Sequence, residues 1–235
     1  MDTPAPPGSL HDSLVEKVGA AIVQGVHASG DRLTTTDLAA GSSRTAGREA
    51  VRVLESLGLV RVRRRTGIEV LPADRWNVFA PEIIRWRLAS GVRDVQLREL
   101  RELRGAIEPL AASLAARHAD DQQREALVAA VLRMAATEHD ADGADYLAAD
   151  VEFHRTLLTA SGNVMFGALG SVVEAVLAGR TLHELMPHDA NPQAVTWHRD
   201  VAFAIAEGDA ERAATAMRLI VREADDAMRE ASTVD

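Results

Sequence analysis

Hydrophobic residues recur at helical spacing along most of the chain, and this pattern predicts a mainly α-helical protein. A first helix is predicted over residues 10–27, where the apolar side chains share one face. A later helix runs from Ser43, a typical N-cap, to Gly58, a typical stop signal. The segments Val60–Arg63 and Ile68–Leu71 alternate between apolar and polar residues, which predicts two half-buried strands joined as a hairpin.

The rest of the chain is expected to contain no further strands. Gly30–Leu33 is predicted as a turn and Thr36–Ala39 as the start of a short second helix. From residue 76 onward the periodicity is helical throughout, with alanine and leucine dominating. The predicted helices span 78–89, 94–118, 121–139, 143–161, 164–186, 191–207 and 209–231.

These elements predict a mainly α fold with two domains. Short helices followed by a hairpin are typical of a winged helix-turn-helix, in which the last helix enters the major groove of DNA. The remainder predicts an all-α bundle of about six to seven helices. We expect a disordered tail over residues 1–9, the DNA-binding domain over 10–75, and an effector-binding and dimerisation domain over 76–235.

Basic residues in the 43–58 helix and the hairpin carry the DNA-binding prediction. Arginines recur every four residues on the outer face of the helix, so this face could contact bases and phosphates. The alternative is an ordinary solvated surface helix, but a hairpin with a basic tip follows it, as in a DNA-binding wing. The predicted DNA-binding residues are Ser43, Arg44, Thr45, Arg48, Arg52, Arg64, Arg65 and Gly67.

The N-terminal residues resemble the GntR superfamily of bacterial transcription regulators over positions 10–71. The resemblance implies a winged helix-turn-helix that binds double-stranded operator DNA. Only Ala40–Ser42 separate the Leu38–Ala39 pair from the Ser43–Arg44 pair, which is shorter than is usual in that family. The shared motifs are Gly30–Leu33, Leu38–Ala39, Ser43–Thr45, Arg48–Ala50, Leu54–Glu55, Gly58–Val60 and Gly67.

The net charge of -9 is unevenly distributed along the chain. Residues 1–75 hold ten basic and nine acidic side chains, whereas the rest holds sixteen and twenty-six. Local cationic surface supplies phosphate affinity, so the acidic remainder does not argue against DNA binding. The chain has no cysteine, which excludes disulfides and thiolate chemistry. No apolar run of membrane-spanning length and no signal peptide are evident, so we expect a cytoplasmic protein that contacts no membrane.

Asp150 and His154 are the first candidates for ligand chemistry. Their i, i+4 spacing places both on one face of the 143–161 helix, and that face is otherwise apolar. A buried ionised carboxylate needs a partner, a proton or a cation. One hypothesis is therefore half of a site for a divalent metal such as Zn²⁺ or Ni²⁺. The alternative is that the two residues pair with each other, or with Arg104, around a metal-free pocket.

The helical half is similar to the FCD-type effector domain of FadR-like GntR regulators over positions 78–230. The shared blocks are Leu103–Arg104, Ile107–Pro109, Ala111–Ala112, Asp150–His154, Ser161–Asn163, His198, Ile205, Gly208–Asp209 and Ala216–Met217. The resemblance implies a metal site to which His198 contributes, with a further histidine at position 220. This chain has Ile220 there, which leaves Asp150, His154 and His198 as the protein ligands. Residues 76–87 resemble members that sense sugar acids and related carboxylates.

Arg104 lies one turn before Glu108 on a predicted core-facing helix. It either clamps the carboxylate of an effector or forms an internal salt bridge with Glu108. The effector site is thus predicted at Arg104, Asp150, His154 and His198, with Arg180, Arg218 and Arg222 as weaker candidates for the anion-binding role.

Together these features predict a homodimeric, ligand-responsive bacterial transcription regulator. We expect a repressor that binds a pseudo-palindromic operator and senses a small carboxylate such as a sugar acid. We do not expect an enzyme, because no motif supplies a further acid or nucleophile. Two alternatives stay open: a metal-dependent hydrolase-like helical domain fused to a DNA-binding module, in which the metal activates water, and a constitutive architectural DNA binder.

Overall fold

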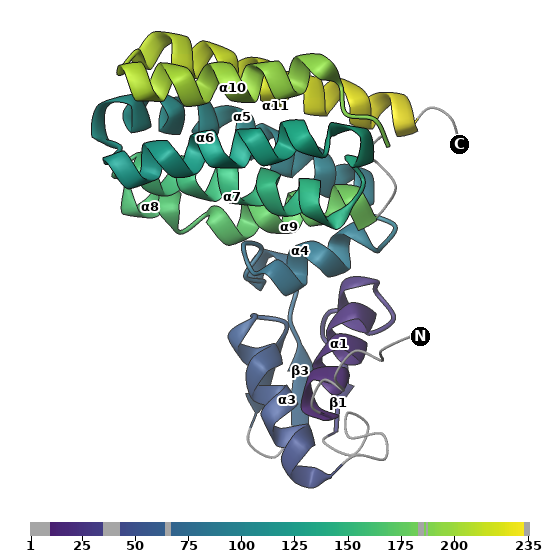
Figure 1. Cartoon of the computed structure of the whole chain (residues 1–235). Helices are drawn as coiled ribbons and strands as arrows, with labels where there is room; N and C mark the ends of the chain where they lie inside the picture. The colour runs from purple at the N-terminus through teal and green to yellow at the C-terminus, as the bar shows by residue number, and fades with distance from the viewer. Residues whose placement is uncertain (1–9, 35–42, 64–66, 183–185, 187, 233–235) are drawn as a thin grey trace. The chain divides into compact units, whose positions relative to one another are not determined.

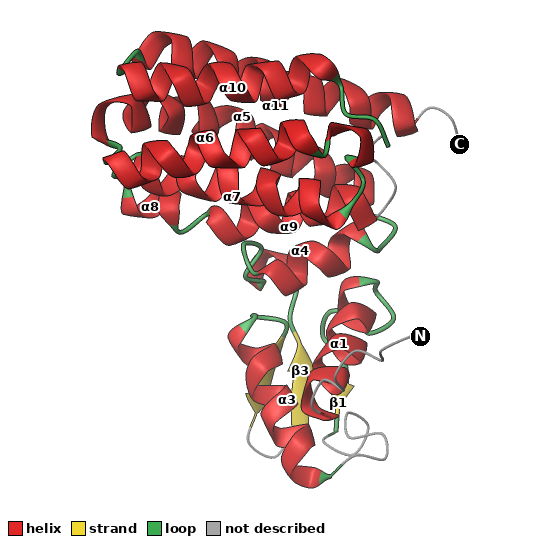
Figure 2. Ribbon diagram, viewed as in Figure 1, coloured by secondary structure: helices red, strands yellow, loops and turns green. Residues whose placement is uncertain are grey.

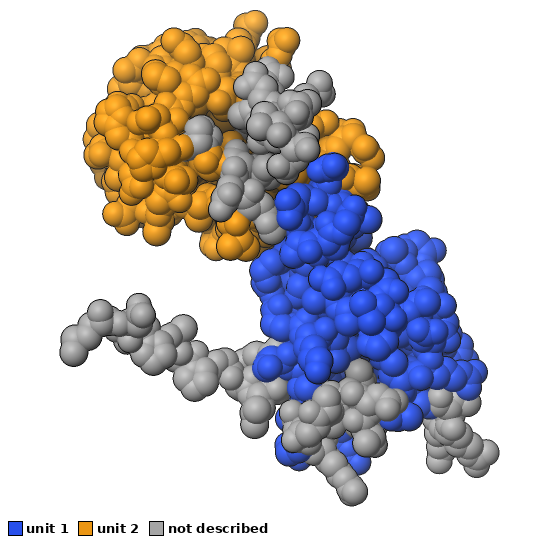
Figure 3. All heavy atoms as spheres, turned by 90° about the vertical axis from the view of Figure 1, so that its right-hand side faces the viewer, with its two compact units in different colours: residues 1–94 blue, residues 95–235 orange. Residues whose placement is uncertain are grey.

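The computed structural model describes residues 10–34, 43–63, 67–182, 186 and 188–232. The chain divides into two compact units, residues 1–94 and residues 95–235 (Figure 3). Helices dominate both units, and the strands of the described residues all belong to the first (Figure 2). The predicted class, a small winged helix-turn-helix followed by a helical domain, is confirmed.

The first unit has the elements of a winged helix-turn-helix. Its described elements are α1 (Leu10–Val23), β1 (Arg32–Leu33), α3 (Arg44–Ser56), β2 (Val60–Arg63), β3 (Gly67–Val70), the 3-10 turn η1 (Ala73–Arg75) and α4 (Pro81–Leu88). The antiparallel sheet has the order β1-β3-β2, and Val60 pairs with Val70 in the hairpin. Ser43 caps α3 by accepting a hydrogen bond from the backbone N–H of Ala46 at 3.2 Å.

Four local expectations for this unit need correction or lie outside what is described. The first helix ends at Val23 rather than at residue 27, because the chain turns at Gly25, whose φ is +79°. Arg32 and Leu33 form a short strand on β3 instead of a turn, with Leu33 opposite Ile68. The expected tail 1–9 and the expected short helix at Thr36–Ala39 lie outside the described residues.

The boundary between the compact units falls after residue 94, whereas we expected it after residue 75. The reason is α4, whose Ile83 and Trp86 are buried in the core of the first unit. The indole Nε1 of Trp86 donates a hydrogen bond to Glu16 of α1 at 2.8 Å. A side chain at Gly19 of α1 would overlap the Trp86 ring, so this glycine permits the close approach of the two helices.

The second unit is a bundle of seven helices within the described residues. They are α5 (Arg93–His118), α6 (Asp121–Ala136), α7 (Ala144–Ala160), α8 (Val164–Gly167), α9 (Gly170–Leu182), α10 (Pro192–Glu207) and α11 (Ala210–Ser232), with a 3-10 turn η2 (Glu138–Asp140). The six to seven helices expected after residue 75 included one over 78–89, which is α4 of the first unit. Helices α10 and α11 pack along each other, as do α6 and α7 (Figure 1). Gly208, with φ of +76°, ends α10 and lets the chain reverse into α11.

One predicted helix of this unit is broken. The segment expected as a single helix over 164–186 forms α8 and α9, which are separated after Gly167 and end at Leu182. The stretch Val164–Leu182 has the length and the mean hydropathy, 1.3, of a membrane-spanning helix. However, Val173 and Leu177 are buried in one cluster with Ala111 of α5 and Leu158 of α7. The middle of the stretch therefore packs in the helical core, although only 39% of the stretch is buried.

Candidate functional site

A cluster of buried polar side chains lies among the apolar core of the helical unit. Asp150 and His154 extend from one face of α7, one turn apart, and His198 extends from α10. All three residues are buried, with 7%, 1% and 4% of their surface exposed. One ligand atom from each lies within 4.8 Å of the others. The structure thus brings together the three residues expected to bind a metal.

Distances and hydrogen bonds define which atoms face one another. Asp150 Oδ1 lies 3.3 Å from His154 Nε2 and 3.4 Å from His198 Nε2. His198 Nδ1 donates to the carbonyl oxygen of Ala194 at 2.7 Å, so the proton sits on Nδ1 and Nε2 keeps its lone pair in the neutral ring. His154 Nδ1 lies 3.2 Å from Glu108 Oε2, which favours the same tautomer for this ring.

Three atoms of the cluster have no hydrogen-bond partner among the described residues: His154 Nδ1, which lies beside Glu108, and Asp150 Oδ1 and His198 Nε2, which face each other. Leaving a buried polar atom unsatisfied costs about 1–3 kcal/mol. A divalent cation would satisfy Asp150 Oδ1 and His198 Nε2 and would also bind His154 Nε2, because a carboxylate and two imidazoles are ordinary ligands for Zn²⁺ or Ni²⁺. The donor set therefore fits a metal ion.

The electrostatic environment keeps the acidic members ionised. Burial raises the pKa of Glu108, but the positive charge of Arg104 and the His154 side chain outweigh it, and the pKa falls to about 2. Burial likewise raises the pKa of Asp150, but His154 and His198 outweigh it and hold that pKa well below the usual range. Both carboxylates are charged at neutral pH, so Asp150 is available as a metal ligand without losing a proton.

Arg104 is bound within the protein. Its Nε and Nη2 donate to the two carboxylate oxygens of Glu108 at 2.8 and 3.2 Å, and Nη2 also lies 3.3 Å from His154 Nε2. Both members of the ion pair are almost completely buried. Of the two roles considered for Arg104, the structure contains the internal salt bridge.

Ile220 occupies the interior position that the resemblance assigns to a histidine. It is 3% exposed and belongs to the same apolar cluster as Phe153. The Phe153 ring contacts the rings of His154 and His198, with centroids 5.4 and 4.9 Å apart. An aliphatic side chain therefore packs in this core where the resemblance implies a histidine, and the cation would have three protein ligands.

The remaining arginine candidates differ in how deeply they are buried. Arg218 and Arg222 of α11 are exposed, so they do not belong to the buried cluster. Arg180 of α9 is 7% exposed, and burial and the charge of Arg104 lower its pKa, while Asp150 and Tyr146 oppose this shift. Sequence reasoning missed Tyr146, although it precedes Asp150 by four residues and so shares its face of α7.

The candidate DNA-binding residues of α3 lie at its N-terminus and along its length. Ser43 forms the N-cap, and Thr45 and Arg48 are exposed. Arg48 makes no hydrogen bond or ion pair with the described residues. Arg52 is exposed and pairs with Glu49 at 2.7 Å. Arg44 begins the helix, but its side chain is outside what the structure describes.

The wing contains an ion-pair network that sequence reasoning did not anticipate. Glu69 of β3 accepts from Arg61 at 3.1 Å and from Arg63 at 2.5 Å, both on β2. These two interactions lower the pKa of Glu69, so the carboxylate stays charged. Gly67 opens β3 with φ of +89°, a conformation that glycine adopts without strain. The expected tip residues Arg64 and Arg65 lie outside the described residues.

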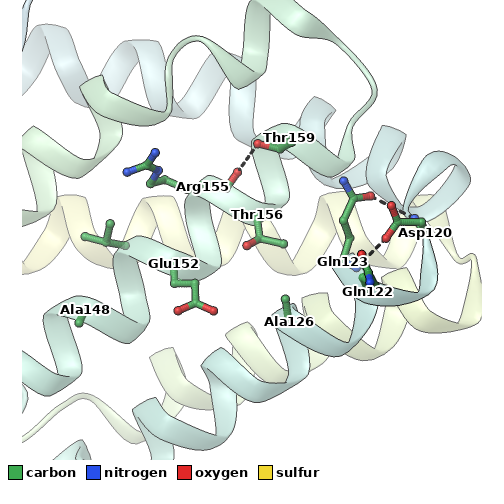
Figure 4. Close-up of a pocket in the computed structure, with 10 residues that line it drawn as sticks. Asp120, Gln122, Gln123, Ala126, Ala148, Glu152, Arg155, Thr156 and Thr159 are labelled. Atoms are coloured by element: carbon green, nitrogen blue, oxygen red, sulfur yellow. Dashed lines mark hydrogen bonds between the residues drawn. The ribbon is translucent and has the colours of Figure 1, made fainter.

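A separate hollow of about 600 Å³ lies on the surface between α6 and α7 (Figure 4). Its polar lining is already engaged: Asp120 and Gln123 form a capping box at the start of α6, and Arg155 pairs with Glu174 at 2.9 Å. None of the residues lining it has the buried, unpartnered polar atoms that mark the cluster around Asp150. We therefore take the buried cluster as the candidate effector site.

Known proteins are similar to this chain in the helical unit and along most of its length. The family model described as the FCD domain matches residues 99–223, a range that includes all members of the buried cluster. Some FCD domains bind metal ions. The galactonate operon transcriptional repressor of Escherichia coli strain K12 is 26% identical over 213 residues, which span 88% of this chain and 92% of that protein.

Two further similarities extend over nearly the whole chain. The HTH-type transcriptional regulator Rv0494 of Mycobacterium tuberculosis, itself uncharacterized, is 30% identical over 210 residues, which span 87% of this chain and 84% of that protein. The solved structure of Escherichia coli McbR/YncC has the same fold, with a TM-score of 0.54 at 18% identity, and the match covers 96% of this chain and all of that one. The chain therefore belongs to the FadR-like branch of the GntR family of transcription regulators, the branch that carries an FCD domain.

Proposed function

We propose that this regulator is a cytoplasmic homodimeric repressor whose affinity for a pseudo-palindromic operator is controlled by a small carboxylate. The effector would bind at Asp150, His154 and His198 together with a divalent cation. The observation that carries the proposal is the unpartnered Asp150 Oδ1 facing two imidazole Nε2 atoms inside an apolar core. The similarity to a repressor named for the galactonate operon supports a sugar acid as the effector class.

Each residue of the centre has a distinct role in this proposal. Asp150 supplies the negative charge, and His154 and His198 supply nitrogen ligands. Glu108 and Asp150 outweigh burial and raise the pKa of His154, so the cation would displace a proton from this ring when it binds. Glu108 and the carbonyl of Ala194 hold the two rings in the required orientation. The cation would supply a positive centre for the carboxylate. Because Ile220 does not coordinate, an additional position stays open to water or to the effector.

Control of DNA binding requires the effector to favour one arrangement of the dimer over another. The proposed reading surface is the exposed face of α3, where Arg48 is unpaired among the described residues, together with the basic wing. A coupling of about 1–3 kcal/mol between the two sites, or roughly 5-fold to 150-fold in operator affinity, is typical of such switches.

The test measures operator binding by fluorescence anisotropy with DNA from the promoter region beside the gene. Protein loaded with Zn²⁺ or Ni²⁺ should bind this DNA, and D-galactonate or a related sugar acid should release it. D-galactose, the neutral analogue, is the matched control. If a panel of sugar acids and dicarboxylates leaves operator affinity unchanged within 2-fold, the carboxylate-sensing part of the proposal is wrong.

The hydrolase alternative makes a different prediction for the same samples. An enzyme would consume the carboxylate or an ester of it, whereas a sensor returns it intact. The relatives are transcription regulators, and we propose that this chain is likewise not an enzyme. Quantifying the ligand by NMR after prolonged incubation with the metal-loaded protein distinguishes the two.

A further inference from the structure

Arg180 is a buried cation that lacks an acidic partner among the described residues. It lies near the end of α9 with 7% of its surface exposed. Within the part of the chain that the structure describes, its Nη2 hydrogen-bonds to the sulfur of Met186 alone, at 3.4 Å, and its Nε has no hydrogen-bond partner. Arg104, in contrast, is held by both carboxylate oxygens of Glu108.

The charged and titratable groups that act on Arg180 come from three helices. Burial lowers its pKa, the positive Arg104 of α5 lowers it further, and Asp150 of α7, Glu223 of α11 and Tyr146 of α7 oppose the change. None of these three groups is within ion-pair or hydrogen-bond distance of it. A guanidinium stays protonated even when buried, so Arg180 is a permanent positive charge in this core.

Tyr146 provides a neutral hydrogen-bond donor in the same region. It is 2% exposed, and its hydroxyl makes no hydrogen bond with the described residues. Burial and the negative charge of Asp150 raise its pKa, so the hydroxyl keeps its proton. A protonated phenol and a guanidinium both donate hydrogen bonds, and neither accepts readily from the other.

An unpaired buried cation is costly, and native proteins keep such groups where a ligand or ion satisfies them. In this cluster, some of the polar groups suit a cation and others suit an anion. Asp150 Oδ1 and His198 Nε2 offer lone pairs for a cation, whereas Arg180 Nε offers a proton for an anion, and none of the three atoms has a hydrogen-bond partner among the described residues. The Tyr146 hydroxyl is a further donor in this region. The arrangement suits a ligand that brings both a metal ion and a negatively charged oxygen group.

We propose that Arg180, assisted by Tyr146, binds the carboxylate of the effector, and that Arg104 does not. This inference rests on the proposed carboxylate-sensing function and names the side chains that recognise the anion. The planar guanidinium can donate two parallel hydrogen bonds to one carboxylate, which selects organic acids over neutral sugars. Arg104 instead fixes Glu108 and, through it, the His154 ring.

The first test needs no effector, because it compares two buried arginines in the free protein. Arg180→Met removes a cation that has no acidic partner among the residues described, so the melting temperature in buffer without added organic acids should stay the same or rise. Arg104→Met leaves the buried Glu108 carboxylate without its cation, so the melting temperature should fall by several degrees. If Arg180→Met lowers the melting temperature as much as Arg104→Met does, Arg180 has a structural acidic partner and the proposal is overturned.

The second test measures thermal shifts of the metal-loaded full chain with D-galactonate, D-tartrate and succinate, with D-galactose as the neutral control. At least one acid should raise the melting temperature of the unaltered protein, and D-galactose should not. Arg180→Met should abolish that shift, Arg180→Lys should retain part of it, and Tyr146→Phe should reduce it. Arg155→Met, which removes an exposed arginine of α7, is the matched control and should respond like the unaltered protein.

The outcomes separate this inference from the function on which it rests. If an acid releases the unaltered protein from operator DNA and also stabilises Arg180→Met by the same amount, the sensing function stands and the role of Arg180 is wrong. If no acid stabilises or releases the unaltered protein, carboxylate sensing itself is wrong. If D-galactose stabilises it as much as the acids do, recognition does not depend on an anion and the inference is overturned.

Discussion

Replacing Glu108 by glutamine tests how much the buried ion-pair cluster stabilises the helical unit. The substitution keeps the shape of the side chain and one carbonyl acceptor, but it removes the negative charge. Arg104, whose side chain is 4% exposed, would then be a buried cation without a counter-charge. His154 would also lose the carboxylate beside its Nδ1, 3.2 Å away.

The structure gives the magnitude by two routes. The pKa of Glu108 falls from 4.5 to about 2, and at 1.36 kcal/mol for each pKa unit this corresponds to about 3 kcal/mol. Removing one partner of a buried ion pair typically costs about 3–5 kcal/mol. We therefore expect the free energy of unfolding to fall by about 3 kcal/mol at pH 7. For a chain of this size that is a decrease of about 6–12 °C in melting temperature.

The dependence on pH follows from the sign of the shift. Because the folded-state pKa of Glu108 is depressed, its contribution is complete above its usual pKa of 4.5 and is lost as the pH falls towards about 2. Glu108→Gln should therefore be much less stable than the unaltered protein at pH 7, and the difference should shrink steadily on acidification.

Urea unfolding followed by far-UV circular dichroism, at pH 7 and at pH 3, measures both effects on the full chain. Glu152→Gln is the control, because Glu152 forms an ion pair with Arg133 at 2.7 Å but is about half exposed. Exposed pairs contribute about 0–1 kcal/mol. The reasoning fails if Glu108→Gln costs less than about 1 kcal/mol at pH 7, or if its deficit is the same at both pH values.

Three further predictions concern the other sites. Arg48→Ala should weaken operator binding by about 1–3 kcal/mol in anisotropy titrations if Arg48 reads a base. Arg52→Ala should weaken operator binding less, because Glu49 already neutralises Arg52, and equal losses for the two variants would contradict this ranking. Ile220→His should add a metal ligand and raise the Zn²⁺ or Ni²⁺ content of the purified protein from a sub-stoichiometric level towards one ion per chain, as measured by elemental analysis. An unchanged metal content would mean that position 220 does not face the cluster of Asp150, His154 and His198. The hydrogen bond from His188 to Asp142, 2.8 Å long, raises the pKa of His188 above 6.5. The stabilisation that this pair gives the folded protein is therefore complete below about pH 6.5 and is lost as the pH rises through the raised pKa. NMR titration should show this elevated pKa, and Asp142→Asn should return it to the usual range; a normal pKa in the unaltered protein would exclude the pair in solution.

Regular elements of the fold could be predicted because their signals are local. The strand Val60–Arg63 and the N-cap at Ser43 agree with the structure residue by residue. The break between α8 and α9 was missed, since the apolar pattern continues across Gly167 and helical periodicity alone does not register it. The domain boundary was misplaced for a different reason. The attachment of α4 to the first unit depends on Trp86, Glu16 and Gly19, which are distant in sequence, and no local pattern reveals such a contact.

Part of the candidate site could likewise be predicted from the sequence and part could not. The shared face of Asp150 and His154 follows from their spacing, and resemblance to a family supplied His198. The state of each arginine could not be predicted, because pairing depends on which side chains meet after folding. Arg104 and Arg180 are both buried arginines, yet only Arg104 has a carboxylate within reach among the described residues.

The ion-pair network of the wing affects how regulator molecules distribute over a genome. Glu69 neutralises part of the charge of Arg61 and Arg63, so fewer cations are available to displace counterions from arbitrary DNA. Non-specific affinity rises with each phosphate that is neutralised, and about 10⁶–10⁹ unrelated sites compete with one operator. Because part of the wing's charge is neutralised, fewer regulator molecules are bound to non-specific DNA at any time. A smaller number of copies in the cell is therefore enough to keep the operator occupied.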